Sequence, residues 1–165
     1  MRSDGFAAVS RPDARILVLG TLPGQASLAA GEYYAHPRNQ FWRIVCDVLG
    51  ASVDLPYERR LRLLLDQGIA LWDVCAAAHR PGSLDSSIEG ASVVANDFAG
   101  FFAAHPGILR VCLNGQQAAK LYQRLVVKTL PDNLKNAWVA LPSTSPANAG
   151  VPFEGKRRAW QAALL

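Results

Sequence analysis

The sequence contains few cysteines, and the three that it has, Cys46, Cys75 and Cys112, lie far apart along its 165 residues. No CxxC pair occurs, so neither a cysteine-based zinc site nor an iron–sulfur cluster with four clustered ligands is supported. The odd count also argues against a disulfide framework and fits a reducing compartment. Because each cysteine has apolar neighbours, we predict three buried thiols.

The usual motifs for nucleotide phosphates and for hydrolytic triads are missing. The glycine-rich stretch GTLPG at 20–24 does not match GxGxxG, and no GxxxxGK[ST] occurs. None of the three histidines, His36, His79 and His105, lies beside an evident nucleophile. Carboxylates and histidines do not cluster at the spacing of metal ligands. We therefore expect no metal and no cofactor.

Long apolar runs are also absent. No stretch reaches the roughly 18 apolar residues of a membrane span, and the first 15 residues carry charges where a signal peptide needs an apolar core. We expect a cytoplasmic monomer without a membrane partner.

A length of 165 residues with 50% hydrophobic residues fits a single domain over 1–165. The excess of 17 Lys+Arg over 13 Asp+Glu permits a polyanionic partner.

Buried apolar runs alternate with amphipathic segments along the chain. Alternation of this kind predicts parallel strands joined by right-handed crossovers. The expected fold class is α/β: a three-layer α/β/α sandwich with a central four-stranded parallel sheet. Pro37 suits the first position of the helix expected at 37–50, which would place Asn39 in that helix's first turn. The expected strands are 15–20, 69–74, 109–113 and 137–141, and the expected helices are 37–50, 57–67, 95–104, 115–126 and 154–165.

Unusual polar residues gather after the predicted strands, where the loops of a parallel sheet converge and ligands bind. These loops read GTLPGQAS, DVCAAAHRPGSLDSSI, NGQQ and PSTSPANAG, and YYAHPRNQFW at 33–42 continues the first of them. Aromatic, amide and hydroxyl groups suit a flat, uncharged heterocycle, while loop amides and basic side chains can hold phosphates. This composition is typical of an enzyme that acts on an extrahelical base.

Taken in order, GTLPG, YYAHPRNQFW, GIALWDV with RPGSLDSSI, LNG and LPSTSPANA resemble the uracil-DNA glycosylase superfamily, and within it the hypoxanthine-DNA (deoxyinosine) glycosylase branch. The resemblance covers about residues 15–165. It implies binding to DNA, a flipped deaminated base, hydrolysis of the N-glycosidic bond and an abasic product. Two positions depart from better-known members: Leu22 replaces the Asp or Asn that orients water, and Leu141 replaces a His or Asn that contacts the base.

The resemblance implies that Asn39 is the catalytic residue. Glycosidic cleavage passes through an oxocarbenium-like state, so water needs alignment more than deprotonation, and an amide carbonyl can align it. The alternative is that Asn39 only satisfies a backbone amide near the helix start.

The resemblance also implies a base pocket. Tyr34 or Phe41 would stack on the base, with Tyr33 and Trp42 in the core. Asp73 would accept the lactam N1–H of hypoxanthine, which adenine lacks, unless it forms a buried salt bridge or a loop cap instead. The expected base-binding residues are Gly20, Leu22, Pro23, Gly24, Tyr34, Phe41 and Asp73.

The LPSTSPANAG loop is expected to enter the minor groove and hold the gap left by the base. Its alternative is an ordinary Pro-flanked turn. Asn114 is expected to fix a loop. Near the loop ends lie Arg38, Arg80 and residues 156–158, which could contact the DNA backbone, although each taken alone is expected to be a solvated charge. The expected DNA-binding residues are Ser27, Arg38, Asn114, Ser143, Thr144, Ser145, Pro146 and Ala147.

Two other functions stay open. A mismatch-specific uracil or thymine glycosylase would keep the reaction and change the base, although Leu22 and Leu141 count against it. A catalytically silent DNA-binding relative would explain why Leu22 has replaced the usual catalytic residue.

Overall fold

A four-stranded parallel sheet forms the centre of the protein, which a computed structural model describes over residues 2–165. The strand order is β3-β2-β6-β7, and the pairing of each neighbour is parallel. All four expected strands are present, with ends shifted by no more than a residue. They are β2 (Ile16–Gly20), β3 (Ile69–Asp73), β6 (Arg110–Asn114) and β7 (Trp138–Leu141).

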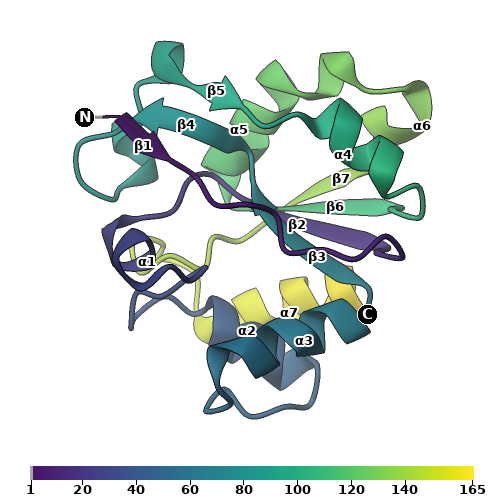
Figure 1. Cartoon of the computed structure of the whole chain (residues 1–165). Coiled ribbons are helices and arrows are strands. Elements are labelled where there is room, and N and C mark those ends of the chain that lie inside the picture. The colour runs from purple at the N-terminus through teal and green to yellow at the C-terminus, as the bar shows by residue number, and fades with distance from the viewer. Residues whose placement is uncertain (1) are drawn as a thin grey trace.

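Helices cover both faces of this sheet (Figure 1). Successive strand residues point to opposite faces, so Val18 packs on one helical layer while Leu17 and Leu19 pack on the other. The three-layer α/β/α prediction is confirmed. One layer contains α2 (Phe41–Val48), α3 (Tyr57–Asp66) and α7 (Phe153–Leu164), and the other contains α4 (Phe98–Ala104), α5 (Gln116–Leu125) and α6 (Asp132–Lys135).

Several short elements were not predicted. A small antiparallel sheet joins β1 (Arg2–Asp4), β4 (Cys75–His79) and β5 (Val94–Ala95). Helix α1 (Gln25–Ala30) follows the first strand, and 3₁₀ turns lie at Asp85–Ser87, Gly90–Ser92 and Val127–Thr129. The helix expected at 95–104 begins at Phe98, because the Asp97 side chain accepts the N–H of Gly100 and caps it.

The start predicted for α2 is wrong. The helix begins at Phe41, with Gln40 as its N-cap, and Pro37 lies in a preceding turn. The Asn39 N–H bonds to the carbonyl of His36 and the Gln40 N–H to the carbonyl of Thr144, so both amides are used outside the helix. Asn39 therefore lies before the helix and not in its first turn.

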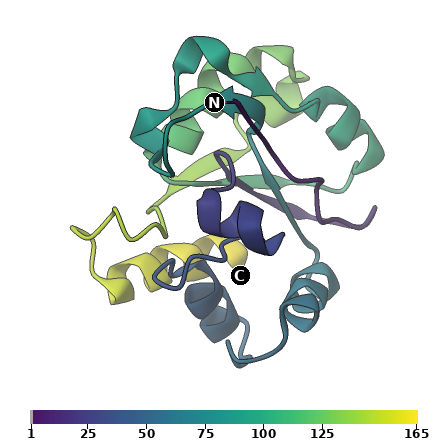
Figure 2. The same cartoon turned by 60° about the vertical axis from the view of Figure 1, so that its left-hand side comes forward.

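The carboxyl ends of the parallel strands meet the loops at one edge of the molecule. Figure 1 shows α1 and the 142–152 loop on the left, and Figure 2 brings them forward. All three cysteines are free and buried, as predicted. No helix within residues 2–165 has the length and apolar character to cross a bilayer.

Candidate active site

The Asn39 side chain is held in one orientation by two donors. Its Oδ1 accepts the backbone N–H of Phe41 at 2.9 Å and the hydroxyl of Thr144 at 2.8 Å. Because a backbone N–H can only donate, the Phe41 contact fixes which end of the amide is oxygen. The amide plane is thereby set relative to α2, although Asn39 itself is outside the helix.

Thr144 is in turn clamped to Asn114 at the end of β6. The Thr144 N–H donates to Asn114 Oδ1 at 3.0 Å, and Asn114 Nδ2 donates to Thr144 Oγ1 at 2.9 Å. Thr144 is fully buried, and Asn114 is 6% exposed. Three segments distant in sequence thus meet in one hydrogen-bonded network, which we call the amide network: Asn39, Asn114 and Thr144.

The other half of the site surrounds Gly20 at the end of β2. A methyl group at this position would lie 2.6 Å from Asp73 Oδ1 and 2.9 Å from Tyr34 Oη, closer than any real side chain allows. Gly20 and Asp73 are also register partners across β2 and β3. The absence of a side chain at Gly20 therefore lets a carboxyl group and a phenol approach the strand end together.

Asp73 is a carboxyl group in a poorly solvated position. It is 4% exposed, and its Oδ2 accepts no hydrogen bond from residues 2–165. Burial, reinforced by Asp85 and opposed by Arg80, raises the pKa of Asp73 to about 7. A buried polar atom without a partner is costly, and strongly shifted pKa values gather at functional sites.

Tyr34 and not Phe41 has a surface left for a ligand. The two rings stack at 4.0 Å with an angle of 20°, and Phe41 is fully buried, with edge contacts to Trp42 and Trp160. The expectation of a base-stacking Phe41 is therefore wrong for this conformation, because Tyr34 and the core cover its ring. Tyr34 has a positive φ of 56°, a strained backbone that proteins retain mainly at functional positions.

The GTLPG loop is fixed from behind by Arg80. Its guanidinium donates to the carbonyls of Leu22 and Pro23 and to Asp85 Oδ1, which also accepts the hydroxyl of Thr21 at 2.6 Å. Arg80 is 4% exposed, so the expected solvated charge is wrong. The Leu22 and Pro23 carbonyls are bound to Arg80, and the Leu22 side chain packs in the core. The GTLPG loop can therefore offer a ligand only its remaining backbone groups.

Two expected DNA-binding hydroxyls are turned inward instead. Ser27 is buried, and its Oγ accepts the N–H of Ala35, so it fixes the loop before Asn39. Thr144 and Asn114 are occupied by each other and by Asn39. Burial of Ser27, Asn114 and Thr144 contradicts direct contact with DNA, and the expectation for Asn114 as a loop anchor is the one that fits.

The remainder of the LPSTSPANAG loop is accessible. Ala147 is exposed, while Ser143, Ser145 and Pro146 are partly buried. Ser143 Oγ accepts the Ser145 N–H and Ser145 Oγ accepts the Ala147 N–H, which gives the loop a defined turn. Gly24 lies against Ser83, and Arg38 is exposed.

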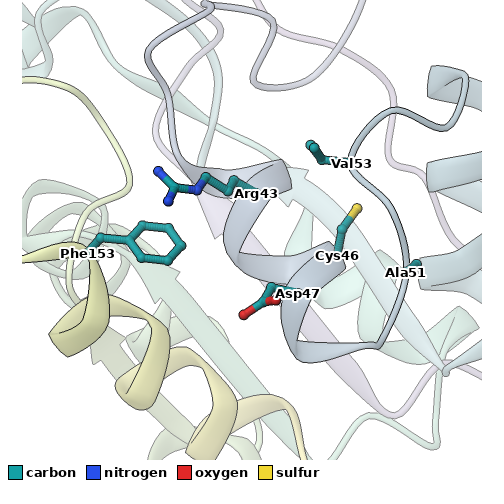
Figure 3. A pocket seen from close by; sticks show the side chains of 6 residues that line it. All are labelled: Arg43, Cys46, Asp47, Ala51, Val53 and Phe153. Atoms are coloured by element: carbon teal, nitrogen blue, oxygen red, sulfur yellow. The ribbon is translucent and has the colours of Figure 1, made fainter.

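A cavity of about 540 Å³ opens beside Asn39 and Tyr34. Its wall includes the exposed His36 and Arg38 and the partly buried Arg60. A second cavity of about 200 Å³ lies on the outer side of α2, where Cys46 faces Val53, and Arg43 covers the ring of Phe153 (Figure 3). Burial raises the pKa of Cys46, which makes its thiol a poor nucleophile. Of the two cavities, the first is the one that Asn39 and Tyr34 line, whereas Asp73 and the GTLPG loop are not part of its wall.

Residues 2–165 contain no group of three His, Cys, Asp or Glu side chains arranged to hold a metal ion.

Comparisons with known proteins identify the family. The model of the family described as the uracil DNA glycosylase superfamily matches residues 7–164. A protein from Methanosarcina acetivorans, named hypoxanthine DNA glycosylase, is 37% identical over 145 residues, which cover 87% of each chain. A protein of the same name from Methanosarcina barkeri is 34% identical over 121 residues, which cover 73% of this chain and 75% of the relative. The solution structure of a proposed uracil DNA glycosylase from M. acetivorans superposes with a TM-score of 0.82 at 34% identity, covering 99% of this chain and 97% of the other.

Proposed function

This chain belongs to the uracil-DNA glycosylase superfamily, and we propose that it is a monofunctional DNA glycosylase that removes hypoxanthine from DNA and leaves an abasic site. The observation that carries the reaction is the amide network, which holds Asn39 beside a cavity at the carboxyl edge of the sheet. The names of the Methanosarcina relatives support hypoxanthine as the base. The enzyme would act as a cytoplasmic monomer, where its free thiols stay reduced.

Asp73 supports hypoxanthine for a chemical reason. The lactam form carries an N1–H, and adenine offers only a lone pair at that position. An ionised Asp73, whose Oδ2 has no partner among the described residues, can accept a hydrogen bond from this N1–H, whereas it would repel the lone pair at N1 of adenine. A buried acceptor discriminates well, because the wrong base leaves it unpaired.

Stacking on Tyr34 would hold the ring of the base. The Tyr34 ring rests on Phe41 and lines the cavity, so its other face can receive a flat heterocycle. Backbone groups of Gly20, Leu22, Pro23 and Gly24 would enclose the opposite side. Aromatic stacking of this kind contributes about 1–3 kcal/mol per base.

Asn39 would align the attacking water. Phe41 and Thr144 both donate to Oδ1 and so fix the orientation of the amide. A water in the cavity beside this amide would meet a carbonyl of fixed direction, as cleavage through an oxocarbenium-like state requires. Asn39 thus takes the role that Leu22 cannot perform.

DNA contact would come from the exposed part of the 142–150 loop. Ser143, Ser145, Pro146 and Ala147 would enter the groove, and Arg38 would approach a phosphate. This surface and the cavity lie at the same edge, because both depend on Thr144, which joins the loop to Asn39.

Single-turnover incision of duplexes with one hypoxanthine, uracil or normal adenine tests this function, with alkali used to cut abasic sites. The wild type should cleave only the hypoxanthine duplex, and Asn39→Ala should slow cleavage by about 100-fold while it retains DNA affinity. The matched control is Asn133→Ala, an exposed amide on α6.

Cleavage of uracil alone would indicate a uracil glycosylase. Tight binding without cleavage of any duplex would indicate a silent DNA-binding relative.

A further inference from the structure

Lys156 is a buried ammonium group beneath the amide network. It lies on α7, is 3% exposed, and donates from Nζ to Gln40 Oε1 at 2.8 Å. Burial lowers the pKa of Lys156. The nearby carboxylate of Glu154 is directed to Arg157 and Arg158 instead, so the partner that the structure gives this cation is a neutral amide.

Such an arrangement is unfavourable for stability alone. A buried charge without a counter-ion loses its hydration and gains little from a neutral partner. Gln40 is also the N-cap of α2, and the positive end of a helix dipole disfavours a cation nearby. A methionine of similar volume would avoid both costs, so the ammonium points to a role other than packing.

Gln40 shows what Lys156 can act upon. It adjoins Asn39 in the chain, and its own N–H donates to the Thr144 carbonyl at 2.9 Å. Its side chain makes no capping bond to α2 and is held by Lys156 instead. Gln40 thus joins α7 to two of the three segments of the amide network, the Asn39 turn and the Thr144 loop.

We propose that Lys156 is a positioning residue of the glycosylase reaction: through Gln40 it fixes the distance between the Asn39 turn and the Thr144 loop, and so the carbonyl that aligns water. This inference depends on the proposed function. Small displacements of an aligned group are expensive, since about 1 Å can cost roughly 100-fold in rate.

The test compares Lys156→Met with Arg157→Met in single-turnover cleavage of hypoxanthine duplex. Arg157 is the next residue of α7 and pairs with Asp47, away from the network, so its loss removes an equal charge. Lys156→Met should slow cleavage by about 10- to 100-fold, with DNA affinity close to that of the control and a melting temperature that is no lower. Lys156→Arg, whose longer side chain keeps a donor for Gln40 Oε1, should recover part of the rate.

A double-mutant cycle identifies the route of the effect. If Lys156 acts through Asn39, Lys156→Met should slow the Asn39→Ala enzyme less than twofold, because the group that it positions is already gone.

Wild-type cleavage by Lys156→Met, or an equal loss in both backgrounds, would overturn the inference while leaving the glycosylase function intact. A wild type that cleaves no hypoxanthine duplex would overturn the proposed function itself, and this inference with it.

Discussion

Replacement of Asp73 by asparagine should stabilise the protein at neutral and alkaline pH but not in acid. Its pKa rises from 3.8 to about 7 in the folded chain, so the folded state binds this proton more tightly than the unfolded state. The stability gained from the neutral carboxyl is complete below pH 3.8 and is lost as pH rises to about 7. Asparagine cannot ionise, and Asp73→Asn therefore escapes that loss.

The magnitude follows from the size of the shift. About 3 pKa units at 1.36 kcal/mol each correspond to about 4 kcal/mol between the two ends of this pH range. Asp73 is buried, so solvent screening reduces this value little. Relative to the wild type, Asp73→Asn should gain about half of this free energy of unfolding between pH 5 and 7 and nothing further above about pH 8.

Urea denaturation at several pH values measures this difference, with Asp132→Asn as the control for an exposed carboxylate. The reasoning fails if the free energies of unfolding of Asp73→Asn and wild type differ by a constant amount from pH 5 to 8. Hypoxanthine cleavage by the wild type should rise over the same range, because the ionised carboxylate is a stronger acceptor for N1–H than the neutral carboxyl group.

Two further changes test the groups around Asp73. Gly20→Ala should destabilise the fold by about 1–3 kcal/mol and reduce base excision more than DNA binding, because its methyl group would press on Asp73 and Tyr34; Gly150→Ala, where space is open, is the control. Arg80→Met should cost about 2–4 kcal/mol in thermal or urea unfolding and raise the pKa of Asp73 further, since Arg80 lowers it. Unchanged stability in Arg80→Met would show that the Leu22 and Pro23 carbonyls do not need its guanidinium.

The central fold could be predicted because its signals are local. Continuous apolar runs such as 15–20 and 109–113 can be buried only as inner strands, and the amphipathic segments between them supply the covering helices. The small sheet was missed because β1 and β5 have two or three residues each and depend on pairing with β4. A pattern of such length carries no periodicity.

The amide network could not be predicted in full for a related reason. Asn39 and Asn114 were identified, but their contact requires Thr144, 105 residues from the first and 30 from the second. Pro37 suggested a helix start, whereas the long-range bond from Gln40 to Thr144 and the local bond from Phe41 to the Asn39 side chain place that start several residues later. Arg80 and Lys156 were predicted to be solvated charges, because the sequence does not show that other segments of the chain cover them in the fold.

The two hydrophobic departures in the family motifs fit this architecture. Leu22 packs in the core cluster on one face of the sheet and Leu141 in the cluster on the other, so neither side chain reaches the cavity. Water alignment would then depend on Asn39, which has no regular helix to hold it. The chain supplies rigidity through Thr144, Asn114, Gln40 and Lys156 instead. An apolar Leu22 after β2 and a hydrogen-bonded turn that carries Asn39 therefore belong to the same arrangement. A Leu22→Asn change alone should not restore a uracil-type site, because Arg80 would still hold the carbonyl of residue 22 inward.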